Sequence, residues 1–474
     1  MVAEQIEVGT GRTGGRDATT GVIPGRFALS VGMPESTPPK GWKWTPLSSV
    51  AQLESGHTPS RKHPEYWDGG IPWIGIKDAT ENHGRTIQDT YQHVSELGLE
   101  NSSARLLPAN TVCLSRTASV GFVVVMGRPM ATSQDFVNWV CGPHIDPHFL
   151  KYVLLAENEA LWRFASGTTH QTIYYPEAKA FHVCLPPLTE QKAIARVLGA
   201  LDDKIELNRW MNATLEAMAR ALFQSWFVNF DPVRAKLDGH QPTGLDKATA
   251  ALFPASFQES RFGSIPAGWS IAALAQLCEK ITDGAHQSPK SVAKGFPMAS
   301  VKDMTNWEID IPGCRHISPE DFESLVANGC QPQGGDVLLA KDGATCLDTA
   351  CEYQQPEKIV LLSSVAILRP RNIADAGFLH TWLGLESTKQ YLKEGFVSGS
   401  AIPRVVLRDM KRAELVVPPR SILDAFASAV SPLRTQIRHN AAQSRTLAIL
   451  RDTLLPKLLN GELPLSTLRE KVTV

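Results

Sequence analysis

The chain has 474 residues, of which 43% are hydrophobic, and its formal net charge at pH 7 is −1. This length is too great for one compact core and predicts about three units with ordinary buried cores. The near-zero charge excludes a protein that holds nucleic acid by overall positive charge, although local basic surfaces are compatible with it. The sequence has no run of about 18 apolar residues and no basic start followed by an apolar core, so neither a membrane span nor a secretory signal is expected.

The eight cysteines form no CxxC motif and have no paired histidines beside them. A zinc site is therefore not expected. Free thiols that pack in protein cores are typical of a reducing compartment, so the expected location is the cytoplasm.

Residues 1–40 are rich in Gly, Thr, Arg and Pro and lack apolar periodicity, which predicts a disordered tail. The segment contains "GTGRTG", which fits the dinucleotide-binding pattern G-x-G-x-x-G. That pattern has meaning only between a strand and a helix, and here turn residues and a proline follow. We interpret it as a chance match, and Met33 is an alternative start of the chain.

The rest of the chain contains an internal repeat. "KGWKWTPLSSVAQLESG" at 40–56 resembles "AGWSIAALAQLCEKITDG" at 267–284, and "IPWIGIKDAT" at 71–80 resembles "FPMASVKDMT" at 296–305. From Gly167 and Gly399 onward the two copies match without gaps at an offset of 232 residues. The repeat predicts these parts: a tail at 1–40, a globular domain at 41–187, a long helix at 188–230, a linker at 231–264, a second globular domain at 265–419, a second long helix at 420–460 and a tail at 461–474.

Short β-branched and apolar runs alternate with turn residues in both globular domains, for example "TVCLSR", "FVNWVC" and "DVLLAK". This pattern predicts strands. One amphipathic helix interrupts each domain, "HFLKYVLLAENEALWRFAS" in the first and "GFLHTWLGLESTKQYLKEG" in the second. We therefore expect an α+β fold in which each domain has a twisted, mostly antiparallel sheet.

Each long helix is expected to begin after a pair of prolines, in "CLPPLTEQ" and "VVPPRSIL", with Thr189 or Ser421 as the N-cap. Apolar residues recur every seven positions over four heptads, which favours a coiled coil. The expected seam of the first helix is Ile194, Leu201, Asn208, Leu215 and Leu222, with Val197, Leu198, Ile205, Met211 and Met218. The expected seam of the second is Phe426, Leu433, Asn440, Leu447 and Leu454, with Val430, Ile437 and Leu450.

Asn208 and Asn440 occupy the same heptad position, where a buried Asn fixes the register of a helix pair. The alternative is that both asparagines are exposed to solvent or face a partner protein. The helices are expected to end or bend at Asp231-Pro232, Pro432, Pro456 and Asn460-Gly461. Helices of about 40 residues are roughly 60 Å long. If they pack antiparallel, the repeat becomes a pseudo-two-fold with two similar domains at a fixed separation, which suits a bipartite, asymmetric DNA sequence.

The order of motifs resembles the family of DNA-specificity (S) subunits of Type I restriction–modification systems. The resemblance covers about 40–462 and rests on the "GW" start, "PPLTEQKAIARVLGALDDKIELN", "MARALFQSWFVNFDPV", "IPAGWS" and "LRDTLLPKLLNGEL". It implies that each globular domain is a target recognition domain that reads one half of a split site in double-stranded DNA. It also implies that the helices space these domains and dock two methyltransferase subunits, to which restriction subunits add, in a prokaryotic cytoplasm. The tail at 1–40 is not typical of this family.

The same resemblance implies a chain without catalysis, with S-adenosylmethionine, ATP and magnesium bound by the partner subunits. The sequence has no N-P-P-[YF] loop of the kind that grips a flipped adenine, and "NFDPV" at 229–233 is the nearest match. It also has no Walker loop.

Polar loops after strand-like runs are the expected DNA contacts, because Arg and Lys read guanine, Asn and Gln read adenine, and Lys, Ser and Thr hold phosphates. Lys77 and Lys302 recur at matching places, as do Arg116 and Lys341, which predicts phosphate contacts. The residues that diverge between the copies are expected to discriminate the two half-sites: Gln134, His170 and Gln171 against Ser364, Ser400 and Arg404. The full expected set is Lys62, Lys77, Arg116, Thr117, Gln134, Thr169, His170, Gln171, His286, Lys290, Lys302, Lys341, Ser364, Ser400 and Arg404.

Two alternatives stay open at this point. One is a self-contained methyltransferase–nuclease fusion, which the missing catalytic motifs disfavour. The other is a coiled-coil scaffold with two ligand-binding heads and no DNA function, which the near-neutral charge permits.

Overall fold

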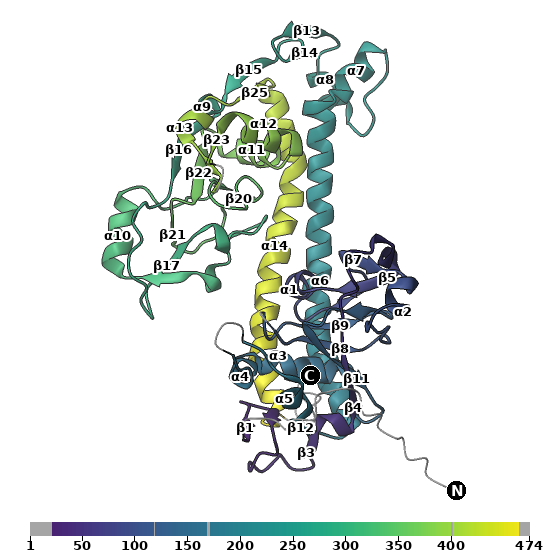
Figure 1. The fold of residues 1–474 in the computed structure, drawn as a ribbon. Helices are drawn as coiled ribbons and strands as arrows, with labels where there is room; N and C mark the ends of the chain where they lie inside the picture. Colours follow the sequence, from purple (N-terminus) through teal and green to yellow (C-terminus); the bar gives the residue numbers. More distant parts are fainter. Residues whose placement is uncertain (1–20, 118, 168–170, 400–401, 464–474) are drawn as a thin grey trace, which may run out of the picture. The chain divides into compact units, whose positions relative to one another are not determined.

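The computed structural model describes residues 21–463 apart from residues 118, 168–170 and 400–401, and it divides into two compact units (Figure 1). Unit 1 consists of the chain up to Ile205 together with the chain from Thr446 onward, and unit 2 is Glu206–Arg445. Each unit contains one domain of mixed helix and strand and one segment of each of two long helices. None of the helices in these described ranges has the length and apolar character needed to cross a membrane.

The domain of unit 1 is built on a five-stranded sheet that is antiparallel except for its last pair. Its strands lie in the order β4 (Ala51–Ser55), β11 (Phe136–Cys141), β8 (Val112–Ser115), β9 (Val123–Met126) and β6 (Thr86–Ile87). A smaller sheet contains β10 (Ala131–Thr132), β5 (Trp67–Ile74) and β7 (Gln92–Val94). The predicted α+β class with mostly antiparallel strands is confirmed.

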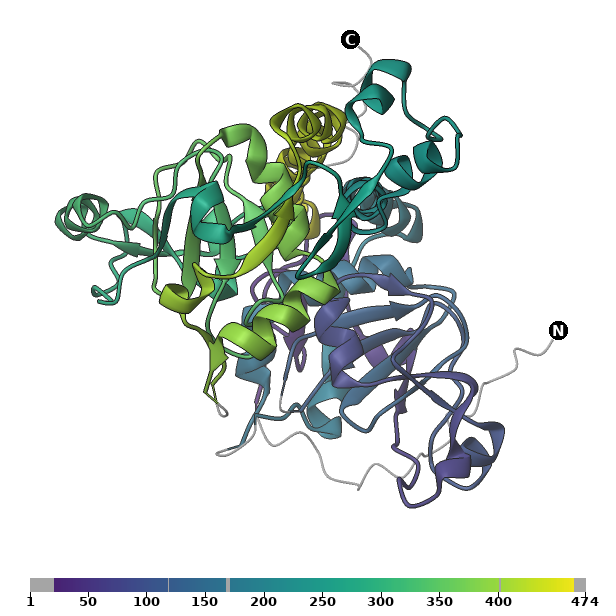
Figure 2. The same cartoon turned by 90° about the horizontal axis from the view of Figure 1, so that it is seen from above.

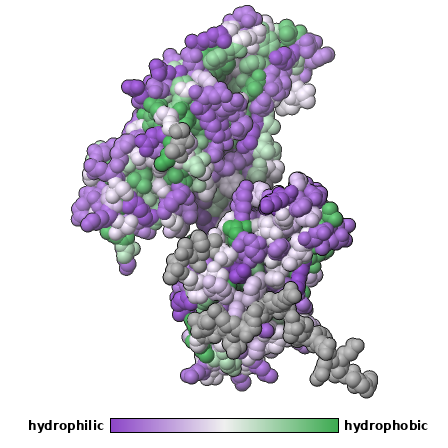
Figure 3. All heavy atoms as spheres, viewed as in Figure 1, coloured by the Kyte–Doolittle hydropathy of each residue, from purple (hydrophilic) through white to green (hydrophobic). Residues whose placement is uncertain are grey.

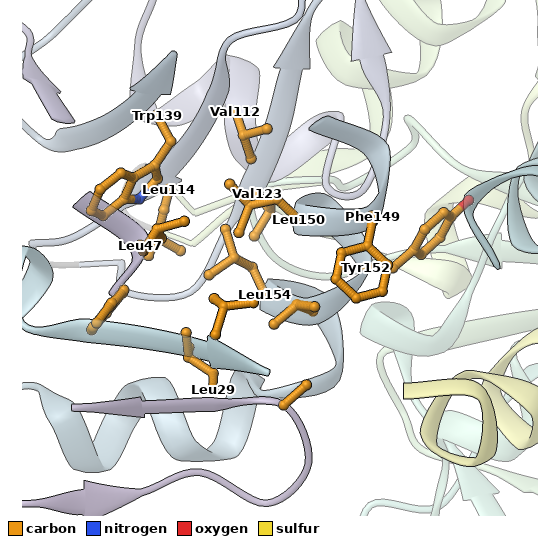
Figure 4. Packing of buried hydrophobic residues seen from close by; sticks show 14 of the residues in the cluster. Leu29, Leu47, Val112, Leu114, Val123, Trp139, Phe149, Leu150, Tyr152 and Leu154 are labelled. Atoms are coloured by element: carbon orange, nitrogen blue, oxygen red, sulfur yellow. The ribbon is translucent and has the colours of Figure 1, made fainter. Parts of the chain in front are cut away.

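The core of unit 1 forms where helix α3 (Pro147–Ala156) covers β8 and β9 (Figure 4). Phe149 and Leu150 of the helix and Leu114 and Val123 of the strands are buried. Burial of apolar side chains on this scale is the main favourable term in folding. It explains why the β-branched runs of the sequence become strands and why the helix lies against them.

The N-terminal segment corrects the prediction of a tail that extends to residue 40. Strands β1 (Ile23–Pro24) and β2 (Leu29–Val31) join β12 (Phe181–Leu185) and β3 (Lys43–Pro46) in one sheet, and Leu29 is fully buried. The buried Glu157 carboxylate accepts backbone N–H groups from four successive residues, Arg26, Phe27, Ala28 and Leu29, at 2.6–3.3 Å. Residues 1–20 lie outside the described part.

The domain of unit 2 repeats the strand orders of unit 1. Its main sheet has the order β16 (Cys278–Asp283), β22 (Val365–Pro370), β19 (Val337–Ala340) and β20 (Ala350–Glu352), which correspond to β4, β11, β8 and β9. Its smaller sheet is β21 (Val360–Leu361), β17 (Phe296–Ala299) and β18 (Arg315–Ile317), with the same parallel and antiparallel pairings as β10, β5 and β7. A further pair, β15 (Ser270–Ala273) with β25 (Glu414–Val417), corresponds to β3 with β12. The internal repeat of the sequence is therefore a repeat of topology.

The single amphipathic helix expected in each domain is in fact two helices. In unit 1, α3 ends before Glu157 and α4 (Asn158–Phe164) follows. In unit 2, α11 (Ala376–Leu383) is followed by α12 (Glu386–Phe396). The physical reasons are local, because Glu157 leaves the helix to bind the N-terminal segment, and Leu385 is extended and buried.

The two long helices are α6 (Leu188–Phe223) and α14 (Arg420–Leu459), and Figure 2 shows them nearly end-on. Both start directly after the proline pairs, so Thr189 and Ser421 lie inside the helices and are not N-caps. A π-helical turn (Gln224–Val228) ends α6, and Phe230 has a left-handed backbone with φ of +57°.

Asp231-Pro232 therefore begins the short helix α7 (Asp231–Leu237) instead of ending the long one. The expected linker also contains α8 (Lys247–Leu252) and the hairpin of β13 (Phe257–Ser260) with β14 (Gly263–Pro266). Helix α14 passes Pro432 and Pro456 without a break, because packing of its apolar face, including Phe426 and Leu458, outweighs the lost backbone hydrogen bonds.

In the second half of α6, the buried residues of the helix pair lie one position later in the sequence than expected. Asn212 and Ala219 are buried, whereas the expected Met218 and its repeat equivalent Leu450 are 49% and 44% exposed. The buried residues of α6 therefore recur every seven positions from Ile205, through Asn212 to Ala219, and Met218 lies outside this seam.

Asn208 and Asn440 are buried where α6 faces α14 in unit 2. Asn208 Nδ2 donates to Ser444 Oγ at 3.1 Å, and Asn440 Nδ2 donates to Asn212 Oδ1 at 2.8 Å. The repeat offset of 232 relates residues 208 and 212 to 440 and 444, so each bond is the repeat equivalent of the other. The helix pair has local two-fold symmetry at this layer, and exposure of the two asparagines is excluded. Their role in fixing register stays a prediction.

Candidate nucleic-acid interface

Four of the loops predicted to contact DNA meet at one edge of the unit 1 domain. The loop after β8 is held by Arg116 N, which donates to Asp135 O at 2.8 Å, and by Ile173 N, which donates to Arg116 O at 2.8 Å. The loop after β4 is held by His57 N, which donates to Thr132 O at 2.9 Å. These backbone bonds bring together segments that lie up to 116 residues apart in the chain.

The same frame recurs in unit 2. Lys341 N donates to Ser364 O at 2.9 Å, Val405 N donates to Lys341 O at 2.8 Å, and Ala285 N donates to Leu361 O at 2.7 Å. A glycine precedes the loop in each copy because a Cβ at Gly56 would lie 2.0 Å, and one at Gly284 2.1 Å, from a backbone carbonyl oxygen. The two edges therefore share their backbone geometry and differ in the side chains that they present.

In unit 1 the guanidinium of Arg116 lies beside polar groups of the described residues of this edge. Arg116 Nε donates to Gln134 O at 3.1 Å, and its guanidinium lies over the Tyr175 ring at 4.7 Å from the centroid. Burial raises the pKa of Tyr175, and Arg116 offsets only part of this, so the phenol stays protonated. The hydroxyls of Thr117 and Thr172 are 2.8 Å apart.

Exposed amide side chains flank this group. Gln134 Oε1 accepts a hydrogen bond from Thr58 Oγ1 at 2.5 Å, and Gln171 Nε2 donates to Gly167 O at 2.9 Å. Thr169 and His170 lie outside the described residues.

In unit 2 the equivalent edge carries alternating charges. Lys341 Nζ lies 3.2 Å from Asp283 Oδ2 and 3.3 Å from Asp342 Oδ1. Arg404 Nε donates to Asp342 at 3.1 Å, and His286 Nε2 lies 3.3 Å from Asp283 Oδ1. Asp342 and Arg404 form an isolated antiparallel β-bridge, as Thr117 and Thr172 do in unit 1. A charged pair in unit 2 therefore occupies the place of two threonines in unit 1.

The environment of Lys341 differs from the expectation of a phosphate contact. Only 5% of its side chain is exposed, and two carboxylates neutralise its charge. The equivalence with Arg116 is real for the backbone but does not extend to the side chain. Arg404, by contrast, is 62% exposed and presents its guanidinium to solvent. Ser364 is half-buried, and its Oγ accepts from Val301 N at 3.3 Å. Ser400 lies outside the described residues.

The remaining expected lysines are exposed: Lys62 and Lys290 lie in loops, Lys77 lies in the short helix α1 (Ile76–Glu81), and Lys302 lies in a 3-10 turn (Val301–Asp303). Lys77 and Lys302 occupy equivalent places after β5 and β17, and the aspartate that follows each is buried and caps the turn. The repeated Lys-Asp pair thus combines a structural carboxylate with an outward ammonium. On the face shown in Figure 3 the surface is mainly hydrophilic, with hydrophobic side chains in small separate patches.

Three residues in the predicted loops are absent from the expected set of individual DNA contacts. Arg61 lies in the loop after β4 with its guanidinium 3.7 Å from the centroid of the Trp67 ring, and its Nη2 donates to Gln92 Oε1 at 2.8 Å. Asp342 and Thr172 lie in predicted loops, but an acid or a threonine in a turn gives no specific signal for a DNA contact. Only the backbone bridge that pairs each with its neighbour identifies them.

The fold and these loops define the class: a protein with two repeated domains, in which one backbone frame presents two different sets of side chains. Comparisons with known proteins agree. Residues 39–217 match the family of the Type I restriction modification DNA specificity domain. The chain is 26% identical over 434 residues to the specificity subunit of the Type I restriction enzyme MjaIX from Methanocaldococcus jannaschii, covering 90% of this chain and 94% of that one.

The chain is also 27% identical over 368 residues to the HindI specificity subunit from Haemophilus influenzae, covering 67% and 77% of the two chains. A crystal structure of a Type I restriction–modification S subunit from M. genitalium aligns with a TM-score of 0.47 and 16% identity, covering 90% and 98%. The family that the motifs indicate is confirmed: residues 39–217 form a Type I DNA specificity domain, and the chain as a whole is similar to Type I specificity subunits.

Proposed function

We propose that this chain is the non-catalytic subunit that reads DNA for a Type I restriction–modification complex. Each domain reads one half of a bipartite, asymmetric site in double-stranded DNA, and the two long helices set the gap between the halves. The observation that carries this proposal is the repeated loop frame: the same backbone bonds hold Arg116 in one copy and Lys341 in the other, while the exposed side chains around them differ. A common frame with different side chains suits two unlike half-sites.

The side chains divide into two roles. The exposed cations that recur in both copies, Lys77 and Lys302, and the half-buried Arg116 hold phosphates. The residues that differ read bases: Gln134 and Gln171 with the Thr117–Thr172 pair in the first domain, and Arg404, oriented by Asp342, in the second. An amide side chain suits adenine and a guanidinium suits guanine.

The partners follow from the same proposal. Two methyltransferase subunits dock on this chain and methylate adenine, and restriction subunits join them for cleavage. S-adenosylmethionine, ATP and magnesium are bound by those subunits, and the complex works in the prokaryotic cytoplasm. Curated relatives that are named as specificity subunits of Type I restriction enzymes support this assignment.

The test is DNA binding and methylation by the chain assembled with its methyltransferase subunit on random and selected duplexes. Arg116→Ala is expected to weaken binding about equally for all sequences and to reduce the salt dependence by roughly one phosphate contact. Arg404→Ala is expected to change which bases are accepted in one half-site only. A heptad inserted into α6 is expected to lengthen the accepted gap. Binding without any sequence preference would favour a two-headed scaffold with no DNA function.

A further inference from the structure

A partly buried polar cluster attaches the recognition domain of unit 1 to its long helix. Asp202 of α6 accepts a hydrogen bond from the Tyr152 hydroxyl at 2.6 Å, and its carboxylate lies 3.3 Å from Lys151 Nζ. Arg451 of α14 donates to the other carboxylate oxygen at 2.9 Å. Burial alone would raise the pKa of Asp202, but Lys151, Tyr152 and Arg451 together lower it, so the carboxylate is ionised.

The cluster in unit 2 uses the opposite charge on the helix. Arg434 of α14 donates to Glu352 at 2.6 Å and to Thr381 Oγ1 at 3.2 Å. Its Nη2 also donates to Gly377 O and to His380 Nδ1, both at 3.0 Å. His380 Nε2 donates to Ala350 O at 3.0 Å, so the imidazole is neutral and offers Nδ1 as the acceptor.

The two clusters occupy equivalent positions of the internal repeat. Asp202 and Arg434 differ by the offset of 232 that relates the two helices, and Lys151 and Tyr152 align with His380 and Thr381 in the matched segments "DPHFLKYVL" and "DAGFLHTWL". A Cβ added at Gly377 would lie 3.1 Å from Arg434 Nε, so the glycine leaves room for the guanidinium. The equivalent residue in the first domain is His148, which would fill that space.

We propose that Asp202 and Arg434 are positioning residues. The charge of each one complements the recognition domain that packs on it and fixes the orientation of that domain on its long helix. This inference rests on the proposed function for its DNA readout but not for its structural one. At this repeat position the helix carries the anion in one copy and the cation in the other. The domain supplies a complementary charge in each copy, and Arg451 of α14 adds a second cation to Asp202.

The charge inversion has a direct consequence for mismatched pairs. The first domain placed against Arg434 would bring the Lys151 ammonium to a guanidinium, and the second domain placed against Asp202 would bring Glu352 to a carboxylate. Buried like charges without partners are strongly unfavourable. A recognition domain of this protein can therefore be moved from one long helix to the other only if the residue that it packs on, Asp202 or Arg434, is moved with it.

The test is amide hydrogen exchange of the purified full-length chain, read separately in α3 and α11. Asp202→Lys is expected to speed exchange in α3 by about tenfold or more, since a buried charged hydrogen-bond network is replaced by like charges. Asp202→Asn is expected to have a smaller effect. Lys151→Glu combined with Asp202→Lys is expected to restore most of the protection, because the new carboxylate lies beside the new ammonium while Arg451, at 31% exposed, can turn toward solvent. Arg434→Gln is expected to act on α11 and not on α3. The exposed neighbours Asp203→Asn and Arg438→Gln are the matched controls.

Methylation with the methyltransferase subunit supplies the second readout. If Asp202 positions the domain, Asp202→Asn broadens the range of gaps accepted between the half-sites, whereas a purely structural role leaves that range as in the native chain. Equal effects of the Asn and Lys variants, no rescue by the double variant, or an unchanged gap range would overturn the proposal. A native chain without sequence preference would refute the proposed function and leave the exchange result intact.

Discussion

Replacement of Asn440 by alanine tests whether the buried polar layer of the helix pair is a specific interaction. Asn440 is 1% exposed, and its Nδ2 donates to Asn212 Oδ1 at 2.8 Å. Its own Oδ1 accepts from Gln436, whose exposed side chain can turn to water at little cost. The loss is therefore that of one buried acceptor without a donor, which costs about 1–3 kcal/mol. The better helix propensity of alanine offsets about 0.5 kcal/mol, so we expect about 2 kcal/mol.

This loss is expected to raise the amide hydrogen exchange rate of the α6 and α14 segments around this layer by about thirtyfold. The double variant with Asn212→Ala is expected to lose less than the sum of the single variants by about 1 kcal/mol, because the two share one hydrogen bond. His439→Ala, at the exposed neighbouring position, is the control and is expected to change little. Strict additivity of Asn440→Ala and Asn212→Ala, or unchanged exchange in Asn440→Ala, would refute the reasoning.

Three further changes have defined outcomes. Glu157→Ala leaves four backbone N–H groups without their acceptor and is expected to lower the unfolding free energy of unit 1 by about 3 kcal/mol, measured by thermal melting; a fall below about 0.5 kcal/mol would contradict the described anchor. Lys341→Met leaves the carboxylates around it without their shared cation and is expected to destabilise unit 2 by about 3 kcal/mol while the salt slope of DNA binding stays constant; a lower slope would restore the phosphate role. Burial, reinforced by Arg434, lowers the pKa of His380 from 6.5 to about 4, so its contribution to stability is complete above pH 6.5 and is lost as the pH falls toward 4. His380→Gln is expected to flatten this pH dependence in denaturant titrations, and an unchanged slope would exclude His380 as its source.

The repeated topology could be predicted because local sequence patterns indicate each of its elements. Proline pairs, heptads and matched segments each indicate an element, and a shared offset relates them, so the two helices and the two α+β domains follow without tertiary information. The helix ends were less certain, since Pro432 and Pro456 are tolerated inside α14 by packing that no local pattern reveals. The seam moved by one residue at Met218 for the same reason.

What could not be predicted depends on partners that are distant in the chain. Residues 21–40 have a composition typical of a tail, but the side chain of Glu157 binds their backbone from about 130 residues away. Its equivalent in the second copy, Glu386, is exposed, so the repeat gave no hint of this contact. The match with Arg116 predicts a phosphate contact for Lys341, and only the structure shows Asp283 beside it. A repeat transfers backbone geometry reliably and side-chain environment poorly.

The most direct test of the central claim is a map of methylated adenines in DNA treated with this chain and its methyltransferase subunit. The account predicts one motif with two unlike halves separated by a fixed number of unspecified bases, in which Arg404→Ala alters one half and leaves the other intact. Methylation without a common motif, or at a single undivided sequence, would contradict it.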